Sequence, residues 1–318
     1  MTAPGARIDR VLAAREGAAL ECWTPGSGTP AWQIPIDGTG HQIAVAPPGN
    51  IARVLTQPPR SHHGRRPAPE PSVVLEVDLG DGTVRSTRRA ATPAVMTSRT
   101  DGQWALRGTE HGPNAWAGEV TLIQPDPATA RELGRYDAID HYFDIRYAPD
   151  LLFLKGRGDK PWLRKWVVAV DTPHGQVRPL FPLEWDTARG GHLSGGCGAY
   201  LHDRAGPALV HTGAVHDGQG LLPGNAYVIR RTYPAGEPRW VFTAGHQATA
   251  LDVDAGFVHV AFDSGELVTL RALDGTVHSR RQLRVGGHPV VPLSLARAGV
   301  GRLAIGTLDG RVLDCRLT

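Results

Sequence analysis

The stretch from Gly224 to Phe242, GNAYVIRRTYPAGEPRWVF, is an alternating apolar and polar run, a turn that contains glycine, and a tryptophan on a second alternating run. Nearly the same pattern occurs near the N-terminus, from Ala18 to Ile34, as AALECWTPGSGTPAWQI. Each copy has a glycine and a tryptophan at matching places, namely Gly28 with Trp32 and Gly236 with Trp240. Alternation with a period of two predicts β-strands, so each copy predicts two strands joined by a turn.

The pattern recurs along the whole chain. Further copies are SVVLEVDLGDGTVRSTRR (72–89), GEVTLIQPDPATARELG (118–134), KWVVAVDTPHGQVRPLF (165–181), GELVTLRALDGTVHSRRQ (265–282) and GRVLDCRLT (310–318). A second mark is a histidine just before a new apolar strand, at His41, His141, His192, His246 and His288. The successive gaps of about 40 to 60 residues match one four-stranded propeller blade per repeat. Only Ala128 to Leu133 is expected to form a helical turn.

The repeat predicts an all-β fold and a single domain over residues 1–318. We expect a seven-bladed β-propeller of four-stranded antiparallel blades, because a blade covers its faces by stacking on its neighbours and a closed ring removes exposed edges. The expected blades cover 1–41, 42–91, 92–141, 142–192, 193–246, 247–288 and 289–318. The last blade shows only three strands, so Pro4 to Arg10 are expected to supply or abut its outer strand and to close the ring near the termini.

These residues carry a family resemblance. The glycine-turn-tryptophan phrases of blades one and five resemble pyrroloquinoline-quinone-type propeller repeats. The Gly-His pairs that open blades two, five, six and seven resemble WD-repeats. The pattern extends over essentially the whole chain, although no Trp-Asp dipeptide ends a blade, and blades two, three, four and six lack the terminal tryptophan. The resemblance implies a degenerate β-propeller repeat protein of a bacterial kind.

Composition excludes several classes of protein. A net charge of +3 with 20% charged residues does not give the global field of a dedicated nucleic-acid binder. Cys22, Cys197 and Cys315 form no CxxC pair, so we expect reduced thiols and neither a disulfide framework nor a zinc site. No cationic start with an apolar core, and no bilayer-length apolar run, is present. A cytoplasmic protein that does not act at a membrane is expected.

The expected blades differ most in the connection between their second and third strands, which opens on the same face as the links between blades. Blades one, six and seven have short turns at 15–17, 263–265 and 308–310. Blades two to five carry inserts at 56–72, 108–118, 156–165 and 213–225. Four elaborated connections side by side predict an asymmetric recognition surface on one arc of one face.

The inserts are rich in arginine, histidine and tryptophan, which combine contact area with directional hydrogen bonding. The predicted binding residues are Arg60, Arg65, Arg66, His111, Trp116, Arg157, Lys160, Trp162, Arg164, Lys165 and His216. An acidic or phosphorylated partner suits this chemistry. The alternative for 56–72 is a solvated loop without contacts.

Reactive side chains are densest between His192 and Asp217, a segment that contains Cys197, His202, Asp203, His211 and His216. An enzyme could use a histidine as acid or base, or Cys197 as a nucleophile, at the mouth of the channel. The spacings match no metal signature, and GxSxG, HExxH and Walker-type motifs are missing from the chain. We therefore expect no metal and no cofactor.

The sequence favours a non-enzymatic scaffold that binds a protein partner through the long loops of blades two to five. Two alternatives stay open: a propeller-fold enzyme with the His/Cys segment as its site, and a sensor that binds a phosphorylated ligand through the loop arginines. Resemblance to stand-alone bacterial propellers implies an ATPase-type component as one possible partner. By itself the chain is expected to be monomeric.

Overall fold

The computed structural model describes residues 11–15, 19–24, 26–46, 49–57, 72–90, 94–108, 118–123, 131–136, 143–156, 164–171, 176–184, 192–216, 221–254, 256–299 and 301–317. Every regular element in these ranges is a β-strand, which confirms the predicted all-β class. No helix in the described part of the chain is long and apolar enough to cross a membrane.

The N-terminal half forms three antiparallel sheets. The first has β1 (Val11–Arg15), β2 (Ala19–Trp23) and β3 (Pro30–Pro35). The second has β4 (Thr39–Ala46), β5 (Ile51–Gln57), β6 (Ser72–Asp78) and β7 (Val84–Ala90). The third has β8 (Ala94–Ser98), β9 (Trp104–Gly108), β10 (Gly118–Ile123) and β11 (Arg131–Tyr136). The expected helical turn is wrong for residues 131–133, because β11 begins at Arg131 and pairs with β10, and residues 128–130 lie outside the described part of the chain.

Next along the chain are a three-stranded and a five-stranded sheet. The three-stranded sheet has β13 (Leu151–Gly156), β14 (Arg164–Asp171) and β15 (Gln176–Glu184). The five-stranded sheet has β12 (Asp144–Arg146), β16 (His192–Asp203), β17 (Gly206–His216), β18 (Leu221–Thr232) and β19 (Pro238–Ala244).

The C-terminal part contains the remaining sheets. One has β20 (Ala248–Asp254), β21 (Phe257–Phe262), β22 (Glu266–Arg271) and β23 (Val277–Gln282). A small hairpin pairs β24 (Arg284–Val285) with β25 (His288–Pro289). The last sheet has β26 (Pro292–Arg297), β27 (Arg302–Thr307) and β28 (Val312–Arg316).

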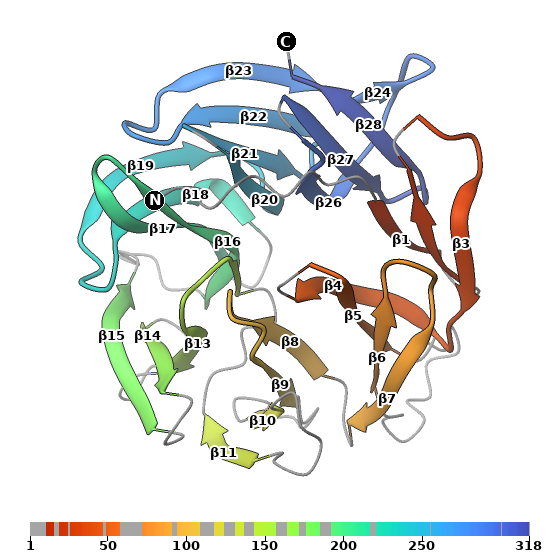
Figure 1. The fold of residues 1–318 in the computed structure, drawn as a ribbon. Helices are drawn as coiled ribbons and strands as arrows, with labels where there is room; N and C mark the ends of the chain where they lie inside the picture. The colour runs from red at the N-terminus through yellow and green to blue at the C-terminus, as the bar shows by residue number, and fades with distance from the viewer. Residues whose placement is uncertain are drawn as a thin grey trace.

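The sheets follow one another around a common centre, from red at β1 to blue at β28 (Figure 1). Apolar clusters fill the space between consecutive sheets. Leu251 and Val268 of the β20–β23 sheet pack with Val228 of β18, for example, and Leu303 of β27 packs with Leu267 of β22. Each sheet is therefore stabilised by burying its faces against its neighbours.

Two tryptophans on outer strands stabilise the contacts between neighbouring sheets. Trp240 of β19 donates its Nε1 hydrogen to the carbonyl of Ala272 in the next sheet, at 2.9 Å, and its ring lies over Gly275. Trp32 of β3 repeats this on Leu79 O, at 3.1 Å, and Gly82. Both glycines have positive φ, +73° and +80°, which favours glycine at the turn. The tryptophan of the repeat thus forms a docking pair with a turn glycine of the next sheet.

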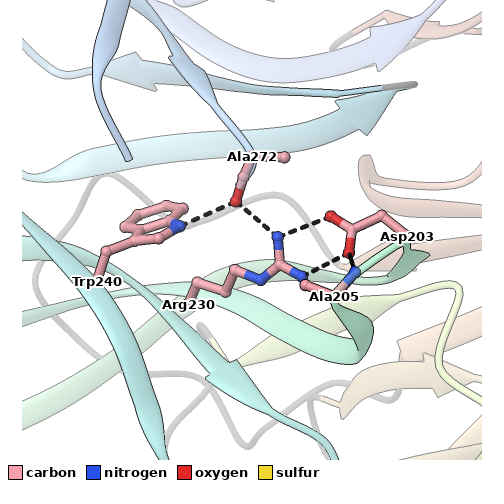
Figure 2. A network of polar contacts seen from close by, with 5 residues as sticks. All are labelled: Asp203, Ala205, Arg230, Trp240 and Ala272. Carbon is pink, nitrogen blue, oxygen red and sulfur yellow. Dashed lines mark hydrogen bonds and ion pairs between the residues drawn. The ribbon is translucent and has the colours of Figure 1, made fainter. Parts of the chain in front are cut away.

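A buried arginine reinforces the contact made by Trp240 (Figure 2). Arg230 of β18, 1% exposed, binds Asp203 through two hydrogen bonds of 2.8 Å. It also donates to the same Ala272 carbonyl, at 2.7 Å, that accepts from Trp240. The Arg230 guanidinium lowers the pKa of Asp203, because it stabilises the carboxylate form. Sheets β16–β19 and β20–β23 are therefore joined by a shared acceptor.

One inner strand departs from the regular plan. β12 pairs in parallel with β16, Asp144 opposite Cys197 and Arg146 opposite Ala199, rather than forming a ladder with β13. This explains why the β13–β15 sheet has three strands and its neighbour has five. β12 is carried toward the inner strands β20 and β26, which Arg146 and Tyr147 contact.

The count of seven four-stranded blades is not confirmed. Among the described residues, three sheets have four strands, one has five, three have three and one has two. Ring closure also stays a prediction, because Pro4 to Arg10 lie outside the described residues and no apolar cluster in the described part joins β26–β28 to β1–β3.

Candidate functional site

The elaborated connections all leave the sheets at the same end of the strands. They follow β5, β9, β13 and β17, each the strand before an antiparallel return. The first three span 58–71, 109–117 and 157–163. The fourth insert is shorter than expected, because β17 continues to His216 and β18 begins at Leu221. Most of the segment 213–225 is strand rather than loop.

Most predicted binding residues lie outside the described part of the chain. These are Arg60, Arg65, Arg66, His111, Trp116, Arg157, Lys160 and Trp162. Three others are described. Arg164 begins β14 and is exposed, and His216 ends β17 and is half-buried. Lys165 is only 6% exposed, so its ammonium group is not part of a surface.

The structure separates the reactive residues of the 192–217 segment. His202 is exposed near the β16–β17 turn, and Asp203 is bound to Arg230. Cys197 of β16 lies beside Thr212, with 3.6 Å between Sγ and Oγ1. Burial raises the pKa of the Cys197 thiol to about 11, so the thiol is protonated at neutral pH. A protonated thiol is a poor nucleophile, which disfavours covalent catalysis at this position.

His211 of β17 is a core residue rather than an acid or base open to substrate. It is 0% exposed and packs edge-on with the rings of Phe143 and Tyr227. Its Nδ1 hydrogen is donated to the carbonyl of Thr212 at 3.1 Å, which leaves Nε2 as an acceptor without a partner in the described part of the molecule. Burial, and secondarily the charge of Arg231, lowers the pKa of His211 from 6.5 to about 3.

This shift predicts an acid-sensitive fold. A histidine whose folded pKa is depressed contributes its full stabilisation above about pH 6.5, and this stabilisation is lost as the pH falls toward about 3. Between pH 8 and pH 5 the His211 contribution to the free energy of unfolding should fall by about 2 kcal/mol. Urea unfolding at both pH values measures it.

Two variants separate His211 from the other titrating groups. His211→Leu removes the titrating ring and should reduce the loss of stability between pH 8 and pH 5 by about 2 kcal/mol. His202→Gln, at an exposed position, should keep the wild-type dependence. Equal pH dependence in wild type and His211→Leu would contradict the assignment.

A shallow depression lies between two sheets at the end that carries the elaborated connections. It has a volume of about 70 Å³ and is lined by residues that include Phe242, His246, Glu266 and Arg280. Arg280 pairs with Glu266 at 3.2 Å and lies over the Phe242 ring. The depression is far smaller than the ~300 Å³ or more of small-molecule pockets. The His246 side chain is 60% exposed, and its Nδ1 lies 3.2 Å from the Asp263 carboxylate.

At the opposite end of the strands, polar groups meet at the centre of the molecule. Asp252 of β20 is 0% exposed. Its Oδ1 accepts from the Tyr147 hydroxyl at 3.0 Å and from Val253 N at 2.8 Å. Its Oδ2 accepts from Arg297 N at 2.8 Å and lies 3.7 Å from Arg146 Nη1. Burial and the nearby Asp252 carboxylate raise the pKa of Tyr147, so its hydroxyl keeps the proton that it donates.

Solved structures share this arrangement of sheets. BamB from Moraxella catarrhalis aligns over 98% of this chain and 92% of its own, with a TM-score of 0.53 and 15% identity. The Cps50 (Swd1) β-propeller domain from Myceliophteria thermophila aligns over 99% and 96%, with a TM-score of 0.65 and 12% identity. This chain is a β-propeller repeat protein. At such identities the likeness shows the fold of the propeller alone. No protein-family model and no curated protein matches its sequence.

Sequence reasoning missed the polar group that Arg146 and Tyr147 form with Asp252. In the described part of the chain no three His, Cys, Asp or Glu side chains are placed to hold a metal ion. Arg146 and Tyr147 stand in an irregular segment, DIRYAPD, that matches the repeat poorly. The available signal was Asp252, an acidic residue within the apolar strand ATALDVD, because a buried carboxylate requires partners.

Proposed function

We propose that this propeller is a non-enzymatic scaffold that binds a protein partner through the end of the sheets carrying the β5–β6, β9–β10 and β13–β14 connections. The observation that supports this proposal is the position of the long connections. In three consecutive sheets the longest connection between strands lies at the same end, whereas the equivalent β21–β22 turn runs only from Phe262 to Glu266. A rigid ring that presents adjacent loops suits recognition of a protein surface.

The chemistry of the described candidates supports binding rather than catalysis. His211 is enclosed by aromatic rings and Cys197 holds its proton, so neither supplies an accessible base or nucleophile. Arg164, exposed at the start of β14, continues the basic sequence Arg157–Lys160 of the preceding connection. The proposed partner surface is acidic, since arginine forms directional bonds with carboxylates. A component of ATPase type that presents such a surface is one candidate.

The test is a pull-down from the host lysate with quantitative mass spectrometry. One variant replaces 157–163 with Asp-Ser-Gly, the sequence of this chain's own β21–β22 turn. A matched control, Arg239→Gln, alters an exposed cation on the outer strand β19. We expect a protein retained by wild type and by the control to fall at least about fivefold with the loop variant.

Two outcomes would contradict the proposal. Equal retention of every protein by wild type and loop variant would remove this end of the propeller from recognition. A ligand that is a phosphorylated small molecule, with binding that weakens steeply as salt increases, would favour the sensor alternative.

A further inference from the structure

The end of the propeller opposite the long connections has a second group of residues of the kind that bind protein partners. It lies where the inner strands β12, β20 and β26 end, at Arg146, Asp254 and Arg297. Because antiparallel strands alternate in direction, this end is separated from the β5–β6, β9–β10 and β13–β14 connections by the length of the sheets. An inference about it goes beyond the proposed scaffold surface and does not depend on it.

The negative charge at this centre is already engaged. The buried carboxylate of Asp252 accepts hydrogen bonds from two backbone amides and from Tyr147, with Arg146 beside it. Nearby acidic groups also have partners. Asp150 accepts from the Tyr233 hydroxyl, and Asp101 pairs with Arg99 at 2.9 Å.

The cations of this centre are Arg146 and Arg297, and the charges of both Asp252 and Asp144 act on Arg146. Arg146 reaches across to Leu295 O at 2.6 Å, and this bond and its approach to Asp252 both use Nη1. The side chain is still 35% exposed, and a guanidinium carries five donors in a planar fork. Arg297 uses its backbone amide on Asp252 and makes no side-chain ion pair in the described part of the molecule. The Arg146 guanidinium and the Arg297 backbone amide therefore both approach the Asp252 carboxylate, and the charge of Arg297 acts on Tyr147.

A tyrosine is held at the same place in an unfavourable backbone conformation. Tyr147 has φ +60°, the only positive φ at a non-glycine residue in the described part of the chain, and it is 44% exposed. The left-handed region is disfavoured for residues with a Cβ, and such conformations persist where the surroundings hold them. The bond from the Tyr147 hydroxyl to Asp252 holds this one and leaves the aromatic ring half-exposed.

We propose that this central end of the propeller, formed by Arg146, Tyr147 and Arg297, binds a carboxylate of an acidic segment of a partner protein. In this complex the exposed part of the Arg146 fork binds the carboxylate of the partner, Arg297 adds positive charge, and the Tyr147 ring packs on the adjoining chain. Exposed arginine and tyrosine beside a buried hydrogen-bonded anchor form the composition that dominates protein interfaces. Arginine matches the planar geometry of a carboxylate better than lysine does.

The binding test uses fluorescein-labelled (Glu-Gly)5 and a matched (Gln-Gly)5 peptide, measured by fluorescence anisotropy with the full chain. We expect the Glu peptide to bind and the Gln peptide to bind at least about tenfold more weakly, since charge-assisted bonds are lost. Arg297→Gln keeps the backbone bond to Asp252 and should weaken binding of the Glu peptide by about tenfold.

Matched variants keep the proposal falsifiable. Arg271→Gln removes an exposed arginine at the same end of the strands but away from the centre, and it should leave binding unchanged. Arg146→Lys keeps the charge but loses the planar fork, and it should also weaken binding, with circular dichroism confirming the fold. Equal losses in Arg271→Gln and Arg297→Gln would show non-specific charge attraction and overturn the site. No binding of the Glu peptide, or displacement by inorganic phosphate but not by succinate, would also overturn it.

Discussion

Replacing Asp203 with alanine is expected to lower the free energy of unfolding by about 3 kcal/mol, because it leaves the Arg230 guanidinium buried without its counter-charge. Arg230 is 1% exposed and makes both of its ionic hydrogen bonds to Asp203 (Figure 2). The remaining bond to Ala272 O cannot compensate for the lost anion. Urea unfolding at pH 7 followed by tryptophan fluorescence measures the change.

A double variant tests the cause. Asp203→Ala combined with Arg230→Met removes the buried charge together with its partner, so it should recover a large part of the lost stability. Recovery would show that the cost comes from the unpaired cation. If the double variant loses as much unfolding free energy as the two single variants together, this explanation is contradicted, because the effects of independent substitutions add.

Gly236→Ala should have a comparable effect through sterics, about 2–5 kcal/mol of lost stability. Gly236 has φ +77°, and a Cβ there would lie 2.0 Å from Cγ of Phe181. Phe181 of β15 is 2% exposed and belongs to the core between two sheets, so it cannot move aside without opening a cavity. Thermal and urea unfolding of the purified variant measure the loss.

Gly310→Ala is the matched control for the backbone term. Gly310 has φ +81° but nothing within 4 Å of the position of its Cβ. Gly310→Ala should lower the free energy of unfolding by about 1–2 kcal/mol, which is the cost of the left-handed conformation for a residue with a Cβ. Equal losses at Gly236 and Gly310 would show that the close approach of Phe181 contributes nothing.

The docking pairs show what the repeat could predict about contacts. Matching of Trp32 with Trp240 correctly indicated equivalent strands, because each tryptophan lies on the outer strand of a pair. Gly28 and Gly236 are not equivalent in backbone conformation, since only Gly236 has a positive φ. The glycines that the tryptophans contact are others, Gly82 and Gly275, in the next sheet of the chain. A single-sequence pattern shows which positions are equivalent, but the partner of each position depends on how the sheets pack.

The candidate sites were predicted unevenly for a similar reason. The connections after β5, β9 and β13 were found because an insertion between alternating strands is a local signal. The assignment of 213–225 as a loop was wrong for 213–216 and 221–225, because polar and glycine residues in β17 and β18 are tolerated where the strands pair with each other. The histidines of the 192–217 segment looked equivalent in sequence, yet His211 is buried and His202 exposed. Side-chain direction along β16 and β17 decides this.

The sequence by itself determined the all-β class, the repeat and the strand equivalences, because alternation and turn residues are set by neighbours along the chain. Only the tertiary structure decided that β12 pairs in parallel with β16 and that Arg146 and Tyr147 meet Asp252. The physical reason is that this pairing joins residues more than 50 positions apart, and a short strand of three residues carries too little local pattern to choose its partner. Packing among the inner strands β16, β20 and β26 makes that choice.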